Sequence, residues 1–300
     1  MYMKFNIVCD SSADLQGSFA EDNKISVVPF YVSFDEKEFK KEGIEVPIDK
    51  FYKAMAEHED CFPTTSMPAV QDYIDTFMPF VNEGKPVLCI CLTSKFSGSW
   101  QSAMTAKQII EDELEGARIE VIDSGLVTAL EGIFVMEATR LRDADFNIDD
   151  AVNELFKIKD TGHIFFTTKD LKYLEHGGRI GKIASVAGNM LNIKPLLHFC
   201  DGELQPTQLC RGRKRSIVKV VDMFIDYLKN NNMNLEGYCF GTGIGCEVPE
   251  YESLIELIEK KFEENNIKPS EWVKVQIGAT IGVHTGPYPV GLGFLKKCEV

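Results

Sequence analysis

The sequence has no uninterrupted apolar run of the roughly 18 residues that a membrane-spanning helix requires. Residues 1–10 also lack the basic start, apolar core and cleavage pattern of a signal peptide. We therefore expect a cytoplasmic protein without an integral membrane segment. Positive charge is scarce as well, since 32 Lys and Arg against 46 Asp and Glu leave a formal net charge of −14. A nucleic-acid partner requires a basic face, so we expect no nucleic-acid partner.

Metal-binding and redox spacings are also missing from the sequence. The nine cysteines are scattered, and no two of them form a C-x-x-C pair. The five histidines stand at positions 58, 163, 176, 198 and 284, which is not a ligand spacing. We therefore expect neither a metal site nor a resident cofactor.

Sequence patterns for nucleotide binding and hydrolysis are absent or incomplete. No P-loop or dinucleotide-binding glycine pattern occurs, and residues 241–245 only imitate one. Ser97 lacks both glycines of the G-x-S-x-G elbow, because Lys95 and Ser99 occupy these positions. Asp10 lacks the second aspartate that the phosphatase pattern places two residues later. A serine hydrolase or phosphatase using Ser97 or Asp10 stays an alternative hypothesis, beside a turn or helix-capping role for both.

The pattern that is present is a regular alternation of strands and helices. Apolar strands are predicted over residues 4–9, 25–34, 86–92 and 118–123, with helices between them, which is typical of a parallel sheet covered on both faces. The second half predicts further strands, a helix over 182–191 and a type I′ hairpin at 201–202. At 300 residues we expect two α/β domains, 1–160 and 161–300.

Residues 86–103 are the strongest candidate for a binding site. A buried strand opens there through hydroxyls and a glycine into a helix, an arrangement that presents free N–H groups to an anion. Thr65 lies in a second hydroxyl-rich loop. Pro68, at the end of this loop, is expected in the first turn of the next helix. Arg179 follows paired glycines, Arg211 opens a basic cluster, and His284 precedes Thr285 and Gly286. Together these donors predict a charge-binding site between the two domains.

Eight segments of the sequence, in order, resemble those of the DegV family, bacterial fatty-acid-binding proteins that work with a fatty acid kinase. The resemblance runs from about residue 6 to residue 294. The segments are IVCDSSADL at 7–15, TTSMP at 64–68, LTSKFSGSWQSA at 92–103, VIDSG at 121–125, DLKYLEHGGRIG at 170–181, LNIKPLL at 191–197, RGRKRS at 211–216 and IGVHTGP at 281–287.

The resemblance implies a two-domain fold, with a mostly parallel N-terminal sheet flanked by helices and a mixed C-terminal sheet. A long-chain fatty acid is implied in a tunnel between the domains. Its carboxylate would be bound by Thr65 and Ser97, with Gly98, Arg211 and His284 close by.

The resemblance also implies a partner. Arg179 would engage an ATP-dependent fatty acid kinase, which converts the carboxylate into an acyl phosphate for phospholipid synthesis. The chain itself would then be a carrier and not an enzyme. The sequence departs from the family pattern at Met67, Trp100 and the pair Tyr288 and Pro289. The first two are expected to reshape the mouth or tunnel and so to change which acyl chains fit, and the third is expected to affect the position of His284.

Overall fold

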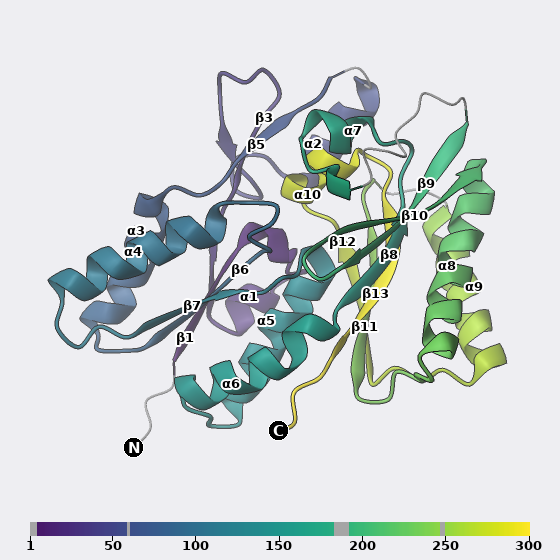
Figure 1. Ribbon diagram of the computed structural model, residues 1–300. Helices are drawn as coiled ribbons and strands as arrows, with labels where there is room; N and C mark the ends of the chain where they lie inside the picture. Colours follow the sequence, from purple (N-terminus) through teal and green to yellow (C-terminus); the bar gives the residue numbers. More distant parts are fainter. Residues whose placement is uncertain (1–4, 59–60, 183–191, 247–249) are drawn as a thin grey trace.

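The chain forms two large β-sheets with helices outside and between them, as the computed structural model shows (Figure 1). It describes residues 5–58, 61–182, 192–246 and 250–300. None of the helices in these ranges is both long and apolar enough to cross a bilayer. The layers, from one side to the other, are helices α3 (Val70–Asn82) and α4 (Ser99–Glu113), a parallel sheet, helix α5 (Thr128–Asp143), a mixed sheet, and helices α8 (Arg213–Asn230) and α9 (Glu250–Asn265).

The parallel sheet has four strands in the order β2-β1-β6-β7, all parallel to their neighbours. Every residue of its central strand β6 is buried, as expected for a strand covered on both faces. Helices α3 and α4 pack on one face, and α5 packs on the other. The strands span Asn6–Asp10 (β1), Ile25–Val28 (β2), Val87–Cys91 (β6) and Ile119–Asp123 (β7).

The mixed sheet has six strands in the order β10-β9-β8-β13-β11-β12. Only β11 and β12 are parallel, and the other neighbours are antiparallel. Asp201 and Gly202 both have positive φ, which confirms the predicted type I′ hairpin between β9 and β10. The strands span His163–Thr167 (β8), Ile193–Cys200 (β9), Glu203–Arg211 (β10), Tyr238–Ile244 (β11), Glu271–Gln276 (β12) and Val290–Lys296 (β13).

Helix α5 joins the two sheets. Its buried residues lie on all sides of the helix, which is typical of a helix enclosed by other elements. Ile133 and Phe134 belong to one core with Cys239 and Leu295 of the mixed sheet. The strands of the parallel sheet precede residue 160 and those of the mixed sheet follow it, while this core contains residues of both halves. The domain boundary at residue 160 stays a prediction.

A small antiparallel sheet, β4-β3-β5, closes one end of the molecule together with three helices. Helix α10, from the C-terminal half, contacts α2, β3 and β5 of the N-terminal half and also α7. These elements span Tyr31–Ser33 (β3), Lys40–Lys41 (β4), Thr64–Ser66 (β5), Ile48–Glu57 (α2), Lys172–His176 (α7) and Ala279–Thr285 (α10). The remaining elements are Phe19–Asp22 (α1), Ile148–Ile158 (α6), Ser11–Ala13 (η1) and Lys159–Thr161 (η2).

Some predicted elements differ from the structure. The strand predicted over 25–34 is two strands, because Pro29 has no N–H for a ladder and the chain passes there from the parallel sheet to the small sheet. Pro68 was expected in the first turn of a helix, but α3 begins at Val70. The loop predicted around Thr65 contains strand β5. The helix predicted over 182–191 lies outside the described residues from 183 onward.

Candidate functional site

A cavity of about 340 Å³ lies between α5, the mixed sheet and the small sheet. This volume falls within the range of about 300 to 1,000 Å³ that is usual for small-molecule sites. Its walls come from both halves of the chain, so it exists only when the two halves are packed together. Most of the lining is apolar and includes Leu92, Phe96, Ile164, Phe166, Leu174 and Phe199.

The cavity has room because four glycines occupy one face of two neighbouring strands. Gly241 lies opposite Gly293, and Gly243 lies opposite Gly291, in the pairing of β11 with β13. All four line the cavity. Successive residues of a strand point to opposite faces, so large residues such as Phe240 pack under α8 and α9 instead. At these four positions the face toward α5 therefore carries no side chains.

The glycines of β13 are also required by their neighbours. A Cβ at Gly291 would lie 2.7 Å from Phe166 Cβ, and one at Gly293 would lie 2.5 Å from the His163 carbonyl oxygen. By contrast, a Cβ at Gly241 would meet only side-chain atoms, at 3.3 and 3.4 Å. This glycine pattern was not predicted. In the sequence, glycine alternates with larger residues over 240–244 and 290–294. This alternation indicates a shared glycine face only when the two strands are known to be neighbours.

Polar groups gather at one end of the cavity. Thr65, Ser97, Gly98, Arg179 and His284 all line it, although they come from positions far apart in the sequence. Thr65 Oγ1 and His284 Nε2 are hydrogen-bonded at 3.2 Å, with donor and acceptor set by the tautomer. The structure thus brings together five of the six predicted site residues.

His284 lies in the last turn of α10. Burial, and then the positive charge of Arg179, lower the pKa of His284 from 6.5 to about 3, so the ring is neutral at pH 7. Its buried Nδ1 has no hydrogen-bond partner among the described residues. A Cβ at position 177 would lie 2.1 Å from this nitrogen, so Gly177 allows the close approach of the α7 turn.

Arg179 is the only formally charged residue among the described residues that line the cavity. Its Nε donates to the Phe96 carbonyl at 3.0 Å, and its Nη1 donates to the Gly177 carbonyl at 2.6 Å. These two bonds fix the guanidinium between the loop that carries Ser97 and the turn after α7. A guanidinium has five N–H groups, so donors are left over for a bound anion.

A buried carboxylate supports the loop at Ser97. The Ser97 hydroxyl oxygen accepts a hydrogen bond from Ser99 N at 3.1 Å, at the start of α4. Ser99 Oγ in turn donates to Asp10 at 2.8 Å, and Asp10 also accepts from Leu92 N and from Ser12 Oγ. Asp10 is fully buried, and burial raises the pKa of its carboxyl group. It therefore ties the end of β1 to the loop and cannot reach a substrate.

A second buried carboxylate holds α10 in place. Glu42 accepts hydrogen bonds from Thr280 N at 2.8 Å and from Thr280 Oγ1 at 2.5 Å. Ser11 Oγ also donates to Glu42, at 2.5 Å. Because Thr280 belongs to the helix that carries His284, this contact fixes a C-terminal site residue against the N-terminal half.

The sixth predicted site residue, Arg211, and the residues that depart from the family pattern have different positions relative to the cavity. Arg211 is exposed at the end of β10 and is not among the described residues that line the cavity. Met67 is 46% exposed and packs over Gly98, where a Cβ would lie 2.6 Å from its sulfur. Trp100 packs against the core on the outer face of the parallel sheet, so it is not a lining residue. Pro289 does line the cavity.

Comparison with known proteins identifies the family. Residues 4–297 match the family described as "Uncharacterised protein, DegV family". A DegV domain-containing protein of Halalkalibacterium halodurans is 32% identical, over 97% of this chain and 98% of its own. The corresponding protein of Caldanaerobacter subterraneus is 30% identical, over 98% and 99%.

Solved structures agree in fold. A stearic acid-binding protein from Eubacterium ventriosum is 33% identical and superposes with a TM-score of 0.89, covering 98% of both chains. A DegV family protein from Thermus thermophilus, described by its fatty acid binding, is 25% identical with a TM-score of 0.82, covering 98% of this chain and all of its own. Family match, relatives and fold agree over almost the whole length, and the chain belongs to the DegV family.

Proposed function

We propose that this protein binds a long-chain fatty acid, with the acyl chain in the cavity and the carboxylate at its polar end. The observation that supports this most directly is an apolar cavity whose described lining includes one charged residue, Arg179, at one end. Burial contributes about 0.8 kcal/mol per methylene, so an acyl chain of roughly fifteen carbons offers more than about 10 kcal/mol.

The carboxylate is the costly part of such a ligand, because burying it without partners costs several kcal/mol. Hydroxyl donors from Thr65 and Ser97, and the remaining N–H groups of Arg179, offset this cost. His284 is neutral and bonded to Thr65, so it orients that hydroxyl and adds no charge. Arg211 does not line the cavity and has no part in this arrangement.

The alternative of hydrolysis has less support. The hydrogen bond at Ser97 Oγ comes from Ser99 N, and no bond joins Ser97 to a histidine in the described residues. A serine nucleophile needs a neighbouring base to accept its proton. Asp10 is fully buried and already accepts several hydrogen bonds, which excludes attack on a substrate in this conformation.

The first experiment is mass spectrometry of lipid extracted from the purified protein. We expect about one long-chain fatty acid per chain in the wild type and less in Ser97→Ala. An esterase assay on the same two proteins tests the alternative. Absence of bound fatty acid, together with esterase activity that Ser97→Ala abolishes, would refute the carrier function.

We also propose that the bound carboxylate is presented to an ATP-dependent fatty acid kinase in the cytoplasm, which forms an acyl phosphate for phospholipid synthesis. Arg179 supports this, since its charge lies beside the position where the phosphoryl group would be added. With kinase, ATP and Mg²⁺, we expect Arg179→Ala to lose both lipid affinity and acyl phosphate, and Arg179→Lys to retain more of each. Full acyl phosphate formation by Arg179→Ala would contradict this role.

A further inference from the structure

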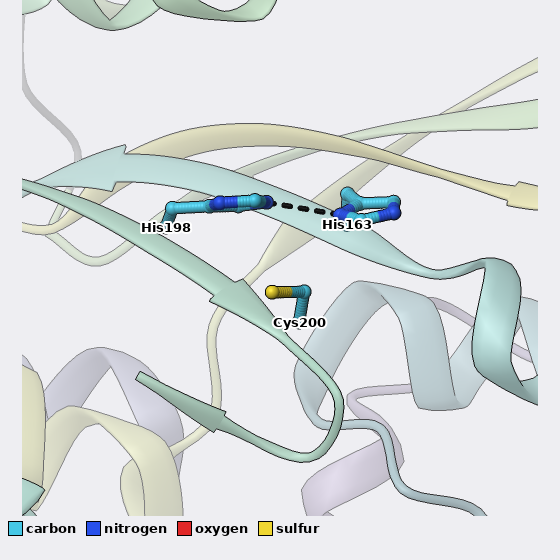
Figure 2. Close-up of side chains that lie close together, drawn as sticks. All are labelled: His163, His198 and Cys200. Carbon is cyan, nitrogen blue, oxygen red and sulfur yellow. Dashed lines mark hydrogen bonds between the residues drawn. The ribbon is translucent and has the colours of Figure 1, made fainter. Parts of the chain in front are cut away.

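Two histidines and a cysteine lie close together on the other face of the mixed sheet. His163 begins β8, and His198 and Cys200 lie near the end of β9 (Figure 2). Their neighbour Phe199 lines the cavity, so the alternating residues His198 and Cys200 point away from it, toward α8. His163 Nδ1 lies 2.9 Å from His198 Nε2, and one ligand atom from each of the three residues lies within 4.8 Å of the others.

Neighbouring side chains already orient both imidazoles. The Tyr227 hydroxyl, on α8, is hydrogen-bonded to His163 Nε2 at 2.8 Å. This leaves Nδ1 as the nitrogen that faces the cluster. Phe165 stacks on His198 with ring centroids 4.3 Å apart and planes within 9°. Metal-binding histidines typically have their second ring nitrogen held by an outer partner, as Tyr227 holds Nε2 of His163.

The protonation states of the two histidines and the cysteine are compatible with binding a metal ion. Burial lowers the pKa of His163, and lowers that of His198 to about 4, so both rings are neutral at pH 7 and keep a lone pair. Burial raises the pKa of Cys200 to about 11, so its thiol would lose a proton on binding a cation. The negative charge of Asp201, at the adjoining turn, acts on all three groups and lies close enough to balance a cation.

We propose that His163, His198 and Cys200 form a binding site for a borderline transition-metal ion such as Zn²⁺, with Asp201 or water as the fourth ligand. Imidazole nitrogen and thiolate sulfur are both usual ligands of Zn²⁺. Bonds of about 2.0 to 2.3 Å in a tetrahedral site place donors roughly 3.3 to 3.6 Å apart, so the two nitrogens need to separate by only a few tenths of an ångström. The site would clamp β8 to β9.

The site does not depend on the proposed lipid function, since it lies on the opposite face of the sheet. It was not predicted from sequence, because the ligands are 35 residues apart for the two histidines and no local spacing marks them. The competing interpretation is a neutral histidine pair packed under Tyr227 without a metal.

The test uses tag-free, chelator-treated full-length protein titrated with Co²⁺ and Zn²⁺. We expect one ion per chain, with a thiolate-to-Co²⁺ absorption band. Cys200→Ser should remove the band, and His198→Gln should weaken Zn²⁺ binding at least tenfold. Cys246→Ser and His58→Gln, two residues outside the cluster, are the matched controls and should bind as the wild type does. Equal binding by all variants, or no stoichiometric binding, would overturn the proposal.

A second measurement avoids variants that fail to fold. Wild-type protein is alkylated with and without Zn²⁺ under partly denaturing conditions, and each cysteine is followed by peptide mapping. We expect Zn²⁺ to slow the modification of Cys200 more than that of Cys210, a buried cysteine of β10 outside the cluster. Equal protection of both cysteines, or protection of neither, would refute a specific site.

Discussion

The glycine face of β11 should determine how long an acyl chain the cavity accepts. Val290 lies near the polar end, because α10 and His284 precede it closely in the chain. With about 3.4 Å per residue, Gly293 and the opposite Gly241 lie about 10 Å further along the strands. Substitution at Gly241 should therefore shorten the cavity at its apolar end and leave the carboxylate site unchanged.

The magnitude follows from the volume that the new side chain occupies. A Cβ at Gly241 would meet Ile133 Cδ1 at 3.3 Å and Ala129 Cβ at 3.4 Å, so α5 needs to give by only a few tenths of an ångström. The methyl group that Gly241→Ala adds would displace about one methylene of the acyl chain, which lowers the affinity by about 0.8 kcal/mol or fourfold. The side chain that Gly241→Val adds would displace about three methylenes, which lowers the affinity for the longest acids by roughly 2.4 kcal/mol or fiftyfold.

The assay is titration calorimetry with a series of saturated fatty acids of increasing length. We expect the affinity of Gly241→Val to fall only beyond a certain length, while short acids bind as they do to the wild type. Gly293→Ala is the contrasting variant. Its Cβ would collide with the His163 carbonyl, so it should lower the melting temperature. If Gly241→Val bound all acids equally more weakly, or bound all of them as the wild type does, Gly241 would not set the length of the cavity.

Three further predictions concern the polar end. Ser97→Ala and Thr65→Ala should each weaken fatty acid binding by about 1 to 3 kcal/mol, since a buried carboxylate oxygen loses a donor; unchanged calorimetric affinity in both variants would place the carboxylate elsewhere. Asp10→Ala should lower the free energy of unfolding in urea by about 3 kcal/mol or more, because Leu92 N and the two serine hydroxyls lose their buried acceptor; a loss below about 1 kcal/mol would be inconsistent with a supporting role. The pKa of His284 is lowered from 6.5 to about 3, so the unfolded chain takes up a proton below pH 6.5 that the folded protein does not. Its contribution to stability is therefore complete above pH 6.5 and is lost as the pH falls toward 3, and wild type should lose more stability between pH 7 and 5 than His284→Gln does; equal losses would argue against a neutral ring.

Some site residues could be predicted because their signal is local. Ser97 and Gly98 follow a buried strand and begin a helix, and this short-range pattern already indicates free donors. Thr65 and His284 were identified by short segments that resemble those of a known family. That they meet in one hydrogen bond, 219 residues apart, could be known only from the fold.

The places of other residues depended on distant packing, which local patterns do not reveal. Arg211 stands in a basic cluster, yet β10 ends with it exposed and away from the cavity. Arg179 was expected both among the donors of the site and as a contact for the kinase, and only the position of the α7 turn puts it in the cavity lining. The chain leaves the parallel sheet at Pro29, because the hydrogen-bond partners of the next strand, β3, lie in β4 and β5.

The sequence by itself determined the α/β class and the family, since apolar periodicity, turn residues and short segments are properties of neighbouring positions. Tertiary structure alone decided the cavity and the His163, His198 and Cys200 cluster. A cavity is the space that packing leaves empty, so the glycines of β11 and β13 form one only when they are paired and faced by α5. Likewise, metal ligands need spatial proximity, which strand pairing between β8 and β9 provides.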